Sequence, residues 1–330
     1  MPQVYYADSE ISLNEDETVL GGLLRHGHAI PNGCQAGACQ SCLMIADDDV
    51  PARSQVGLTD AQKEMGYFLS CCCTPTEDIS VKLDPEASQK ISATTIDKTA
   101  LNHKVYRLQL DAELDYKAGQ FITLSKDENL SRSYSLASVP GLDHFIELHI
   151  KHIDDGEFSS WIADELASGH ELHIQGPKGL CFYTAKDKDQ PLFLSGLGTG
   201  LAPLYGIVRD ALNQGHTGPI NMIIGSRTND GLYLIDELMT LADTHDNLRV
   251  TLVTQESSQD NSKEKPQESS LIQQADIYAL SKELIPDMKG YRVFLCGADS
   301  FVKKMKRQCF MAGANMPDIS ADPFLPTGAT

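Results

Sequence analysis

The sequence lacks the features that would place it in a membrane, on a nucleic acid or outside the cell. No apolar run approaches the roughly 18 residues that a membrane helix needs. Lys and Arg number 27 against 46 Asp and Glu, and the formal net charge of −19 argues against nucleic-acid binding. The start of the sequence has no basic segment of the kind that opens a signal peptide. We expect a soluble, cytoplasmic protein that does not insert into membranes and is a monomer.

Metal-ligand spacing is absent among the ten histidines but present among the nine cysteines. Cys34, Cys39 and Cys42 have the spacing C-x4-C-x2-C, and a run of three cysteines follows about thirty residues later. This spacing is typical of a plant-type 2Fe–2S cluster. A structural zinc site usually has two C-x2-4-C pairs, and disulfide-rich folds are short secreted chains, so both alternatives fit less well.

Spacing alone allows Cys71, Cys72 or Cys73 as the fourth cluster ligand. The segment also resembles plant-type ferredoxins, in which the fourth ligand lies in L-x-C-x-x-x-P. Leu69, Cys71 and Pro75 match that segment. The resemblance therefore implies Cys34, Cys39, Cys42 and Cys71 as metal ligands, with Cys72 and Cys73 as the open alternatives.

The chain divides into three segments with different strand and helix signals. Residues 1–88 combine short strands with a helix from Thr18 to His26, which has Leu20, Leu23 and Leu24 on one face, as in the β-grasp (α+β) shape of these ferredoxins. Residues 89–185 contain alternating strands and one short helix over Ser160–Ala167, which predicts an antiparallel β-barrel. Residues 186–330 alternate strands and helices, which predicts a parallel α/β sheet, and the polar stretch 255–270 reads as a surface loop.

The middle segment contains Arg132-Ser133-Tyr134-Ser135, followed by Ile150-Lys151 and by Gly156 to Ser159. Together these motifs resemble the flavin domain of the ferredoxin–NAD(P)H reductase family. The resemblance implies that Arg132 pairs with the flavin pyrophosphate, Tyr134 stacks on the flavin ring, and Ser135 bonds near flavin N5. A helix N-terminus at Gly156 and Ser159 suits phosphate. The other cofactor-binding residues expected here are His149, Ile150 and Lys151.

Three motifs of the last segment resemble the nicotinamide domain of the same family. Glycine-rich Gly198-Thr199-Gly200 opens a predicted helix, where backbone can approach a pyrophosphate closely. Arg227 follows the next strand, where the family recognises the nucleotide ribose. Cys296-Gly297 ends a predicted strand, at the edge where α/β sheets bind ligands, and the resemblance places Cys296 beside the nicotinamide. Asp322 and Phe324 match the acidic-x-aromatic ending, so Ser135, Cys296, Asp322 and Phe324 are the expected catalytic residues.

The domain order resembles the reductase components of bacterial multicomponent oxygenases. It implies an NAD(P)H-dependent oxidoreductase that passes electrons from NADH through FAD to the cluster and on to an oxygenase or hydroxylase. Residues 1–88 contain 14 Asp and Glu against 4 Lys and Arg, which suits docking on a basic partner surface. Arg227 is the one cation evident for a 2′-phosphate, so we expect NADH over NADPH. The alternatives are a non-oxygenase acceptor, such as a sugar-deoxygenating enzyme, and a redox-responsive interaction protein without turnover.

Overall fold

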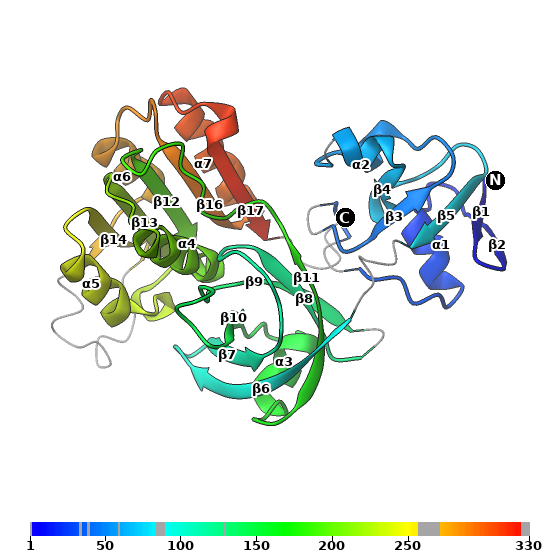
Figure 1. Cartoon of the computed structure of the whole chain (residues 1–330), viewed down its shortest axis with the longest axis horizontal. Helices are drawn as coiled ribbons and strands as arrows, with labels where there is room; N and C mark the ends of the chain where they lie inside the picture. Colours follow the sequence, from blue (N-terminus) through cyan, green and yellow to red (C-terminus); the bar gives the residue numbers. More distant parts are fainter. Residues whose placement is uncertain are drawn as a thin grey trace.

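The computed structural model of the chain describes residues 2–32, 35–37, 40–58, 60–83, 90–127, 130–256 and 271–324. Figure 1 shows three units in chain order, each built around its own sheet. We call them the N-terminal unit (described residues up to 83), the barrel (90–178) and the C-terminal unit (192–324). None of the helices in these described ranges is both long and apolar enough to cross a bilayer.

The N-terminal unit is a small mixed sheet with one main helix packed on it. The strand order is β2-β1-β5-β3-β4, with β1 parallel to β5 and the other pairs antiparallel. The strands are β1 (Gln3–Tyr6), β2 (Ser9–Ser12), β3 (Leu43–Ala46), β4 (Tyr67–Leu69) and β5 (Ile79–Leu83). Helix α1 (Val19–Arg25) begins at Thr18, whose Oγ1 accepts a hydrogen bond from Gly21 N at 3.1 Å. Leu20 and Leu23 are buried, whereas Leu24, expected on the same face, is exposed. The short helix α2 spans Asp60–Glu64.

The barrel is a six-stranded antiparallel sheet in the order β10-β7-β6-β11-β8-β9. Its strands are β6 (Ile91–Ala100), β7 (Val105–Asp111), β8 (Phe121–Ser125), β9 (Ser131–Ser135), β10 (Ile146–Lys151) and β11 (Glu171–Lys178). A bridge between Leu136 and Leu148 brings the two edge strands together and closes the sheet. Helix α3 (Glu157–Asp164) starts three residues earlier than expected, because the extended Gly156 is its N-cap and Glu157 occupies the first turn.

The C-terminal unit is a six-stranded parallel sheet with helices on both faces. Its strands are β12 (Leu192–Leu197), β13 (Ile220–Ser226), β14 (Leu248–Thr254), β15 (Ile272–Gln274), β16 (Arg292–Ala298) and β17 (Ile319–Phe324), in the order β15-β14-β13-β12-β16-β17. Helices α4 (Leu201–Asn213) and α5 (Ile235–Thr244) share one core, and α6 (Ile277–Leu284) and α7 (Asp299–Met311) share the other. The strand order reverses between β12 and β16, and ligands bind at such a switch point in α/β sheets.

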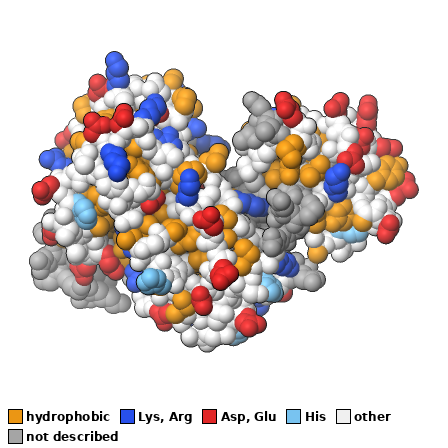
Figure 2. Space-filling model, in the orientation of Figure 1, with side chains coloured by type: hydrophobic (Ala, Val, Ile, Leu, Met, Phe, Trp, Pro, Cys, Tyr) orange, Lys and Arg blue, Asp and Glu red, His pale blue; other side chains and the backbone are white. Residues whose placement is uncertain are grey.

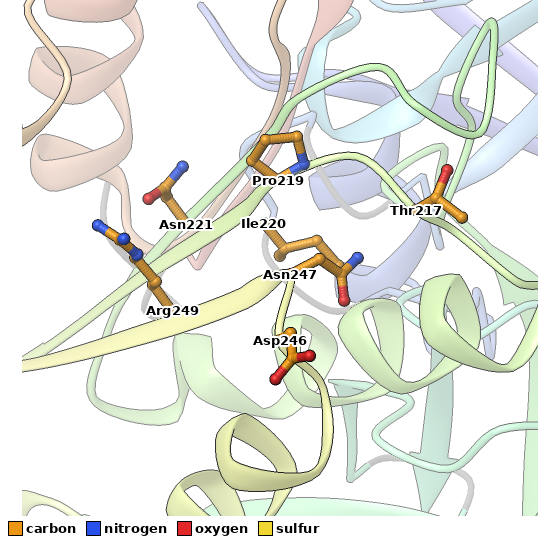
Figure 3. Close-up of a pocket in the computed structure, with 7 residues that line it drawn as sticks. All are labelled: Thr217, Pro219, Ile220, Asn221, Asp246, Asn247 and Arg249. Carbon is orange, nitrogen blue, oxygen red and sulfur yellow. The ribbon is translucent and has the colours of Figure 1, made fainter.

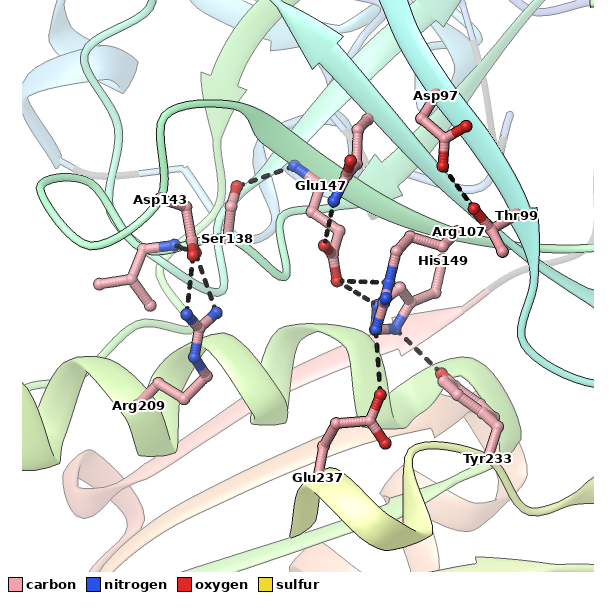
Figure 4. Close-up of polar contacts among 12 residues, drawn as sticks. Asp97, Thr99, Arg107, Ser138, Asp143, Glu147, His149, Arg209, Tyr233 and Glu237 are labelled. Atoms are coloured by element: carbon pink, nitrogen blue, oxygen red, sulfur yellow. Dashed lines mark hydrogen bonds and ion pairs between the residues drawn. The ribbon is translucent and has the colours of Figure 1, made fainter. Parts of the chain in front are cut away.

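Polar contacts join the barrel to the C-terminal unit, and Figure 4 shows them. Asp143 receives two hydrogen bonds from the Arg209 guanidinium of α4, at 2.7 and 2.9 Å. The fully buried His149 imidazole of β10 lies between Glu147 Oε1, 2.9 Å from Nε2, and Tyr233 Oη, 3.2 Å from Nδ1. Charged groups with so little access to water are stable only when paired, so these contacts specify one relative position of the two units.

The expected fold class is confirmed in all three units. Each sheet lies inside one of the three segments 1–88, 89–185 and 186–330. The boundaries themselves stay predictions, because residues 84–89 lie outside the described residues. Most of the expected surface loop at 255–270 also lies outside them.

Candidate functional site

The carboxyl ends of β12 and β16 bring two of the sequence motifs into contact. The strands are parallel neighbours in which Gly196 pairs with Cys296, so the glycine loop 198–200 follows one strand beside the end of the other. A Cβ on Gly200 would lie 2.2 Å from the Cys296 carbonyl oxygen. Only glycine permits this approach. It places the loop backbone close to the switch point, and α4 begins directly after the loop.

A third motif reaches the same edge through β17. Asp322 pairs with Cys296 and Phe324 with Ala298, so both expected C-terminal residues lie at the carboxyl end of the sheet. Ser135 Oγ of the barrel donates a hydrogen bond to Asp322 Oδ2 at 2.9 Å. Burial raises the pKa of Asp322 to about 6, and the hydrogen bond from Ser135 opposes part of that rise. The pair therefore holds a carboxyl group that exchanges a proton near neutral pH.

Cys296 is completely buried beside a second cysteine, Cys181, to which no sequence motif pointed. The Cys296 and Cys181 sulfurs lie 3.7 Å apart, and both residues are buried. Burial raises the pKa of the Cys296 thiol well above its ordinary value, with Cys181 adding to the rise. Cys296 is accordingly a neutral thiol that contributes shape and contact at this edge.

Strand β9 carries the four residues of the R-x-Y-S motif with alternating orientation. Tyr134 packs toward the barrel core, with its ring centroid 5.9 Å from that of Phe158, and burial raises its pKa. Arg132 is half-buried, and its Nη1 donates to Ser131 O at 2.7 Å. Among the described residues no carboxylate pairs with Arg132. A sheltered guanidinium without an acidic partner fits an anionic ligand such as a pyrophosphate.

The other residues expected around a flavin lie in the same unit but do not all face one space. Gly156 is the N-cap of α3, and Ser159 Oγ accepts a hydrogen bond from Ile153 N at 3.0 Å, which orders the turn before the helix. Ile150 is buried in the barrel core and Lys151 is exposed. The His149 side chain faces Tyr233 of the C-terminal unit instead, so its cofactor role stays a prediction.

Two of the expected cluster ligands lie side by side in the N-terminal unit. Cys42 and Cys71 are both buried, and their sulfurs are 3.1 Å apart, too far for a disulfide. Two thiolate ligands of one tetrahedral metal, with bonds of about 2.3 Å, lie about 3.7 Å apart. Contact with the Cys42 thiol, together with burial, raises the pKa of Cys71. Only a bound cation can therefore hold both sulfurs as thiolates here, as an iron–sulfur cluster does.

The remaining cysteines of the run differ in surroundings. Cys72 Sγ is 3.7 Å from Cys71 Sγ and lies against Gly37, where a Cβ would be 2.7 Å from it. Cys73 is fully buried in the sheet core, and burial raises its pKa to about 11 despite a hydrogen bond with Ser54. Cys34 and Cys39 lie outside the described residues, and the described part of the chain contains no group of three metal-ligating side chains. Cys71 stays the predicted fourth ligand.

Comparison with known proteins accounts for all three units. Residues 5–76 match the 2Fe-2S iron-sulfur cluster binding domain, residues 91–183 the oxidoreductase FAD-binding domain, and residues 193–307 the oxidoreductase NAD-binding domain. The phenol hydroxylase P5 protein of Acinetobacter pittii is 30% identical over 253 residues, covering 72% of this chain and 71% of that protein. The chain belongs to the ferredoxin–NAD(P)H reductase family.

More distant relatives match this reductase along nearly its whole length. The ferredoxin–NAD(P)(+) reductase component of the naphthalene 1,2-dioxygenase/salicylate 5-hydroxylase systems of Ralstonia sp. is 29% identical and covers 94% of both chains. Among solved structures, the Amycolatopsis cytochrome P450 reductase GcoB has a TM-score of 0.70 at 24% identity, covering 99% of both chains. That likeness shows the fold of the three units together.

The cofactors of the reductase are a 2Fe–2S cluster, FAD and NADH. The features that fit them are Arg132, which has no carboxylate partner among the described residues, the buried Cys42–Cys71 pair, and the close backbone approach at Gly200. FAD, when bound, supplies the change from two-electron to one-electron chemistry that neither NADH nor the cluster provides.

A hollow elsewhere in the C-terminal unit is not the nucleotide site. Figure 3 shows this space of about 360 Å³. It is lined by Thr217, Pro219, Ile220, Asn221, Asp246, Asn247 and Arg249. These residues lie at or before the first residues of β13 and β14, whereas the motifs converge on the opposite, carboxyl edge of the sheet. Ligands of open α/β sheets bind at the carboxyl edge, so geometry decides against the hollow.

Sequence motifs missed the residues that join the units of the reductase. Ser41, Thr123 and Ser133 form a hydroxyl cluster between the N-terminal unit and the barrel. Arg227 lies 3.2 Å from Glu256, a residue just before the part outside the described ranges. The only sequence signal for the Ser41 contact is its position directly before Cys42. Contacts between segments far apart in the sequence produce no residue spacing that a motif could detect.

The cluster ligands can be separated by single substitutions. Cys71→Ser should abolish the visible absorbance and the iron content of the cluster, because Cys71 Sγ is the one nearest to Cys42 Sγ. Cys72→Ser, the matched control one residue away, should keep both. Loss of the cluster in Cys72→Ser alone would move the fourth ligand by one residue.

The buried Asp322 carboxyl makes stability depend on pH in a defined direction. The native carboxyl binds its proton more tightly than an unfolded one, so native stability falls as pH rises from the unfolded pKa of 3.8 through the native value of about 6. In flavin-free protein, the stability of Asp322→Asn relative to wild type should therefore rise by about 1 kcal/mol between pH 5.5 and 7.5. Urea unfolding at each pH measures this.

Asp318→Asn provides the control for that series. The hydrogen bond from Lys186 lowers the pKa of Asp318, which therefore stays ionised throughout this pH window. The difference in free energy of unfolding between Asp318→Asn and wild type should not change between pH 5.5 and 7.5. If the stability difference between Asp322→Asn and wild type also did not change with pH, the Asp322 carboxyl would have an ordinary pKa in the native protein.

Proposed function

We propose that this reductase passes electrons from NADH through FAD to its 2Fe–2S cluster and on to an oxygenase or hydroxylase component. The relatives named above are components of aromatic hydroxylase and dioxygenase systems. The observation that carries the proposal is that two contacts converge on β9. Ser135 donates a hydrogen bond to Asp322 of β17, the strand beside the one that carries Cys296, and Ser133 contacts Ser41, the residue before Cys42. The carboxyl edge of the C-terminal sheet and the loop that carries Cys42 therefore both contact this one strand of the barrel.

The residues of the carboxyl edge have separate tasks in this scheme. The backbone of Gly198 to Gly200 and the start of α4 hold the nucleotide pyrophosphate, with Thr199 in the same turn. The open positive-φ position at Gly198 leaves room for that group. Cys296 and Gly297 shape the nicotinamide position, and Phe324 covers the flavin face. The Asp322 carboxylate orients the Ser135 hydroxyl, and the pair can hold or release one proton at Asp322 Oδ2.

The acceptor docks on the acidic N-terminal unit. Figure 2 shows Asp and Glu side chains spread over the visible face of this unit. The exposed acidic residues are Asp8, Glu10, Glu15, Asp16, Asp47, Asp48, Asp49, Glu64, Glu77 and Asp78. Two of its cations, Arg25 and Lys82, are paired with Glu17 and Asp47. A basic partner surface suits this field, and we propose that a monomeric reductase meets it in the cytoplasm, where thiols stay reduced.

NADH is the preferred donor in this proposal. The Arg227 guanidinium, the expected reader of the ribose, is 3.2 Å from Glu256 Oε1. An NADPH 2′-phosphate at this place would have to displace Glu256 and face its negative charge. The ion pair therefore favours the uncharged ribose hydroxyl of NADH.

Removing that acidic charge should loosen the preference. Glu256→Gln should raise kcat/KM for NADPH by about threefold, the effect of one exposed charge, and leave kcat/KM for NADH unchanged. Glu283→Gln, at another exposed glutamate of the C-terminal unit, should change neither value. Wild-type kcat/KM for NADPH equal to that for NADH would contradict the preference.

The proposed electron order is tested by dividing the chain at residue 88. Residues 89–330 should still reduce ferricyanide with NADH at the rate of the full chain, because Arg132, Ser135, Cys296 and Asp322 all lie there. They should not reduce cytochrome c efficiently or support an oxygenase component, because Cys42 and Cys71 are missing. Equal support of the oxygenase by both chains would show that the cluster is not the exit.

An anaerobic NADH titration of the full chain, followed by visible absorbance, separates the other classes of function. Complete bleaching of flavin and cluster within seconds is expected for an electron carrier. Absence of bleaching by NADH and by NADPH would favour a redox-responsive interaction protein. Purification of the acceptor distinguishes an oxygenase from a non-oxygenase enzyme such as a sugar-deoxygenating one.

A further inference from the structure

Strand β9 carries a row of three serines on its outer face. Side chains alternate along a strand, so Ser131, Ser133 and Ser135 share one face while Arg132 and Tyr134 lie on the other. We call these three the β9 serine row. Ser131 Oγ donates to Asn32 O of the N-terminal unit at 3.1 Å, and Ser135 Oγ donates to Asp322 of the C-terminal unit at 2.9 Å. The row therefore touches both neighbouring units, one at each end.

The middle serine belongs to a cluster of three hydroxyls. Ser41 Oγ lies 3.1 Å from Thr123 Oγ1 and 3.5 Å from Ser133 Oγ, and Thr123 Oγ1 lies 3.2 Å from Ser133 Oγ. Thr123 and Ser133 are directly opposite each other in the β8–β9 ladder, so both point outward from the barrel. Thr123 is nevertheless only 2% exposed and Ser41 only 4%, because each covers the other.

These hydroxyls hold the loop that carries a cluster ligand. Ser41 is the residue directly before Cys42, and Lys178 Nζ at the end of β11 donates to Gln40 O at 3.2 Å. Contacts from β8, β9 and β11 therefore hold residues 40–42 from three strands of the barrel. A buried hydroxyl without a hydrogen-bond partner costs free energy. If the loop left this position, water would have to enter and bond to the exposed hydroxyls.

The serine row sets how far the loop is from the reacting edge. Residues two apart on a strand are separated by about 7 Å. Ser133, which touches the residue before Cys42, is therefore about 7 Å along β9 from Ser135, which touches Asp322. Electron transfer between separate groups slows steeply with distance, so a shift of this loop by a few ångström would change its rate.

We propose that Ser41, Thr123 and Ser133 are positioning residues that hold the cluster loop against the barrel and so set the rate of electron transfer from flavin to cluster. The proposal rests on the electron order given above. With both cofactors bound, this step would move one electron from the reduced flavin to the oxidised cluster. No bond to the protein forms or breaks, and the second electron follows after the acceptor has taken the first.

The kinetic test uses the complete reductase with FAD and cluster bound. Ser41→Ala and Thr123→Val each remove one hydroxyl from the cluster, and after rapid mixing with NADH each should slow cluster reduction by about fivefold. Flavin reduction by NADH should stay within about twofold of wild type, since Ser135, Cys296 and Asp322 are unchanged. Both substitutions disrupt the same contact, so the double variant should be about as slow as the slower single variant.

Thr95→Val is the matched control for these substitutions. Thr95 is a buried threonine of the same barrel, on β6, and its Oγ1 has no hydrogen-bond partner among the described residues. It should reduce the cluster at the wild-type rate. Iron and flavin content are measured for every variant, and if one single variant fails to bind its cofactors the other carries the test.

A second measurement reports on position without turnover. In oxidised protein without NADH, amide hydrogen exchange in a peptide covering residues 40–46 should be faster in Ser41→Ala and Thr123→Val than in wild type and in Thr95→Val. This readout does not depend on any electron reaching the cluster.

The outcomes are separable from those of the proposed function. Cluster reduction within about twofold of wild type in the double variant would overturn the proposal, and so would slower reduction with unchanged exchange at residues 40–46. If the electron order itself is wrong, the wild-type chain will fail to reduce its cluster with NADH, whereas failure of the positioning role leaves that wild-type reaction intact.

Discussion

The alternation of side chains along β9 is the constraint on which the relation of the three units depends. Tyr134 packs toward the barrel core, and Ser131, Ser133 and Ser135 contact the neighbouring units. A slip of one residue in the β8–β9 pairing would exchange the two faces. It would turn Tyr134 outward and remove the serine hydroxyls from both contacts at once. The contacts of β9 with both neighbouring units are therefore set by one register.

The two interfaces of the barrel differ in chemistry. Toward the C-terminal unit it uses pairs of charged side chains, in which Asp143 pairs with Arg209 and Arg107 pairs with Glu237. Breaking one partner of such a pair leaves an uncompensated charge, so this interface favours a single arrangement. Toward the N-terminal unit the barrel uses three small hydroxyls, one lysine and one serine–carbonyl bond. Contacts that are mostly neutral are more easily opened. The hydride-transfer half is accordingly the more rigid one.

Much of the fold and the outline of the site could be predicted from the sequence, because their signals are local. The alternating strand patterns of residues 89–185 predicted the barrel, and the spacing of Cys34, Cys39 and Cys42 predicted the cluster domain. Helix boundaries were harder to predict: the helix expected over Ser160–Ala167 begins at Glu157, with Gly156 as its N-cap. Leu24 has helical spacing with Leu20 and Leu23 but lies beyond the edge of the buried face.

The contacts between units could not be predicted, because they join residues far apart in the sequence. Ser41 and Thr123 are unremarkable alone, and Cys181 gave no sign that it would lie beside Cys296. The same holds for the Ser135–Asp322 hydrogen bond, which the family resemblance could suggest only as two separate roles. Long-range pairing is a property of the folded arrangement of strands and has no local spacing.

The neutral hydroxyl cluster has a consequence for how the solution environment controls electron flow. Ions screen the attraction between an acidic surface and a basic partner beyond about 8 Å at physiological ionic strength. Uncharged hydroxyls in a nearly dry contact are largely indifferent to such screening. Electron transfer from flavin to cluster and electron transfer from cluster to acceptor therefore respond differently to the same change in ionic strength. If the acceptor docks on the acidic N-terminal unit as proposed, a change in ionic strength would change how often this reductase meets it, while the electron supply to the cluster would remain as it was.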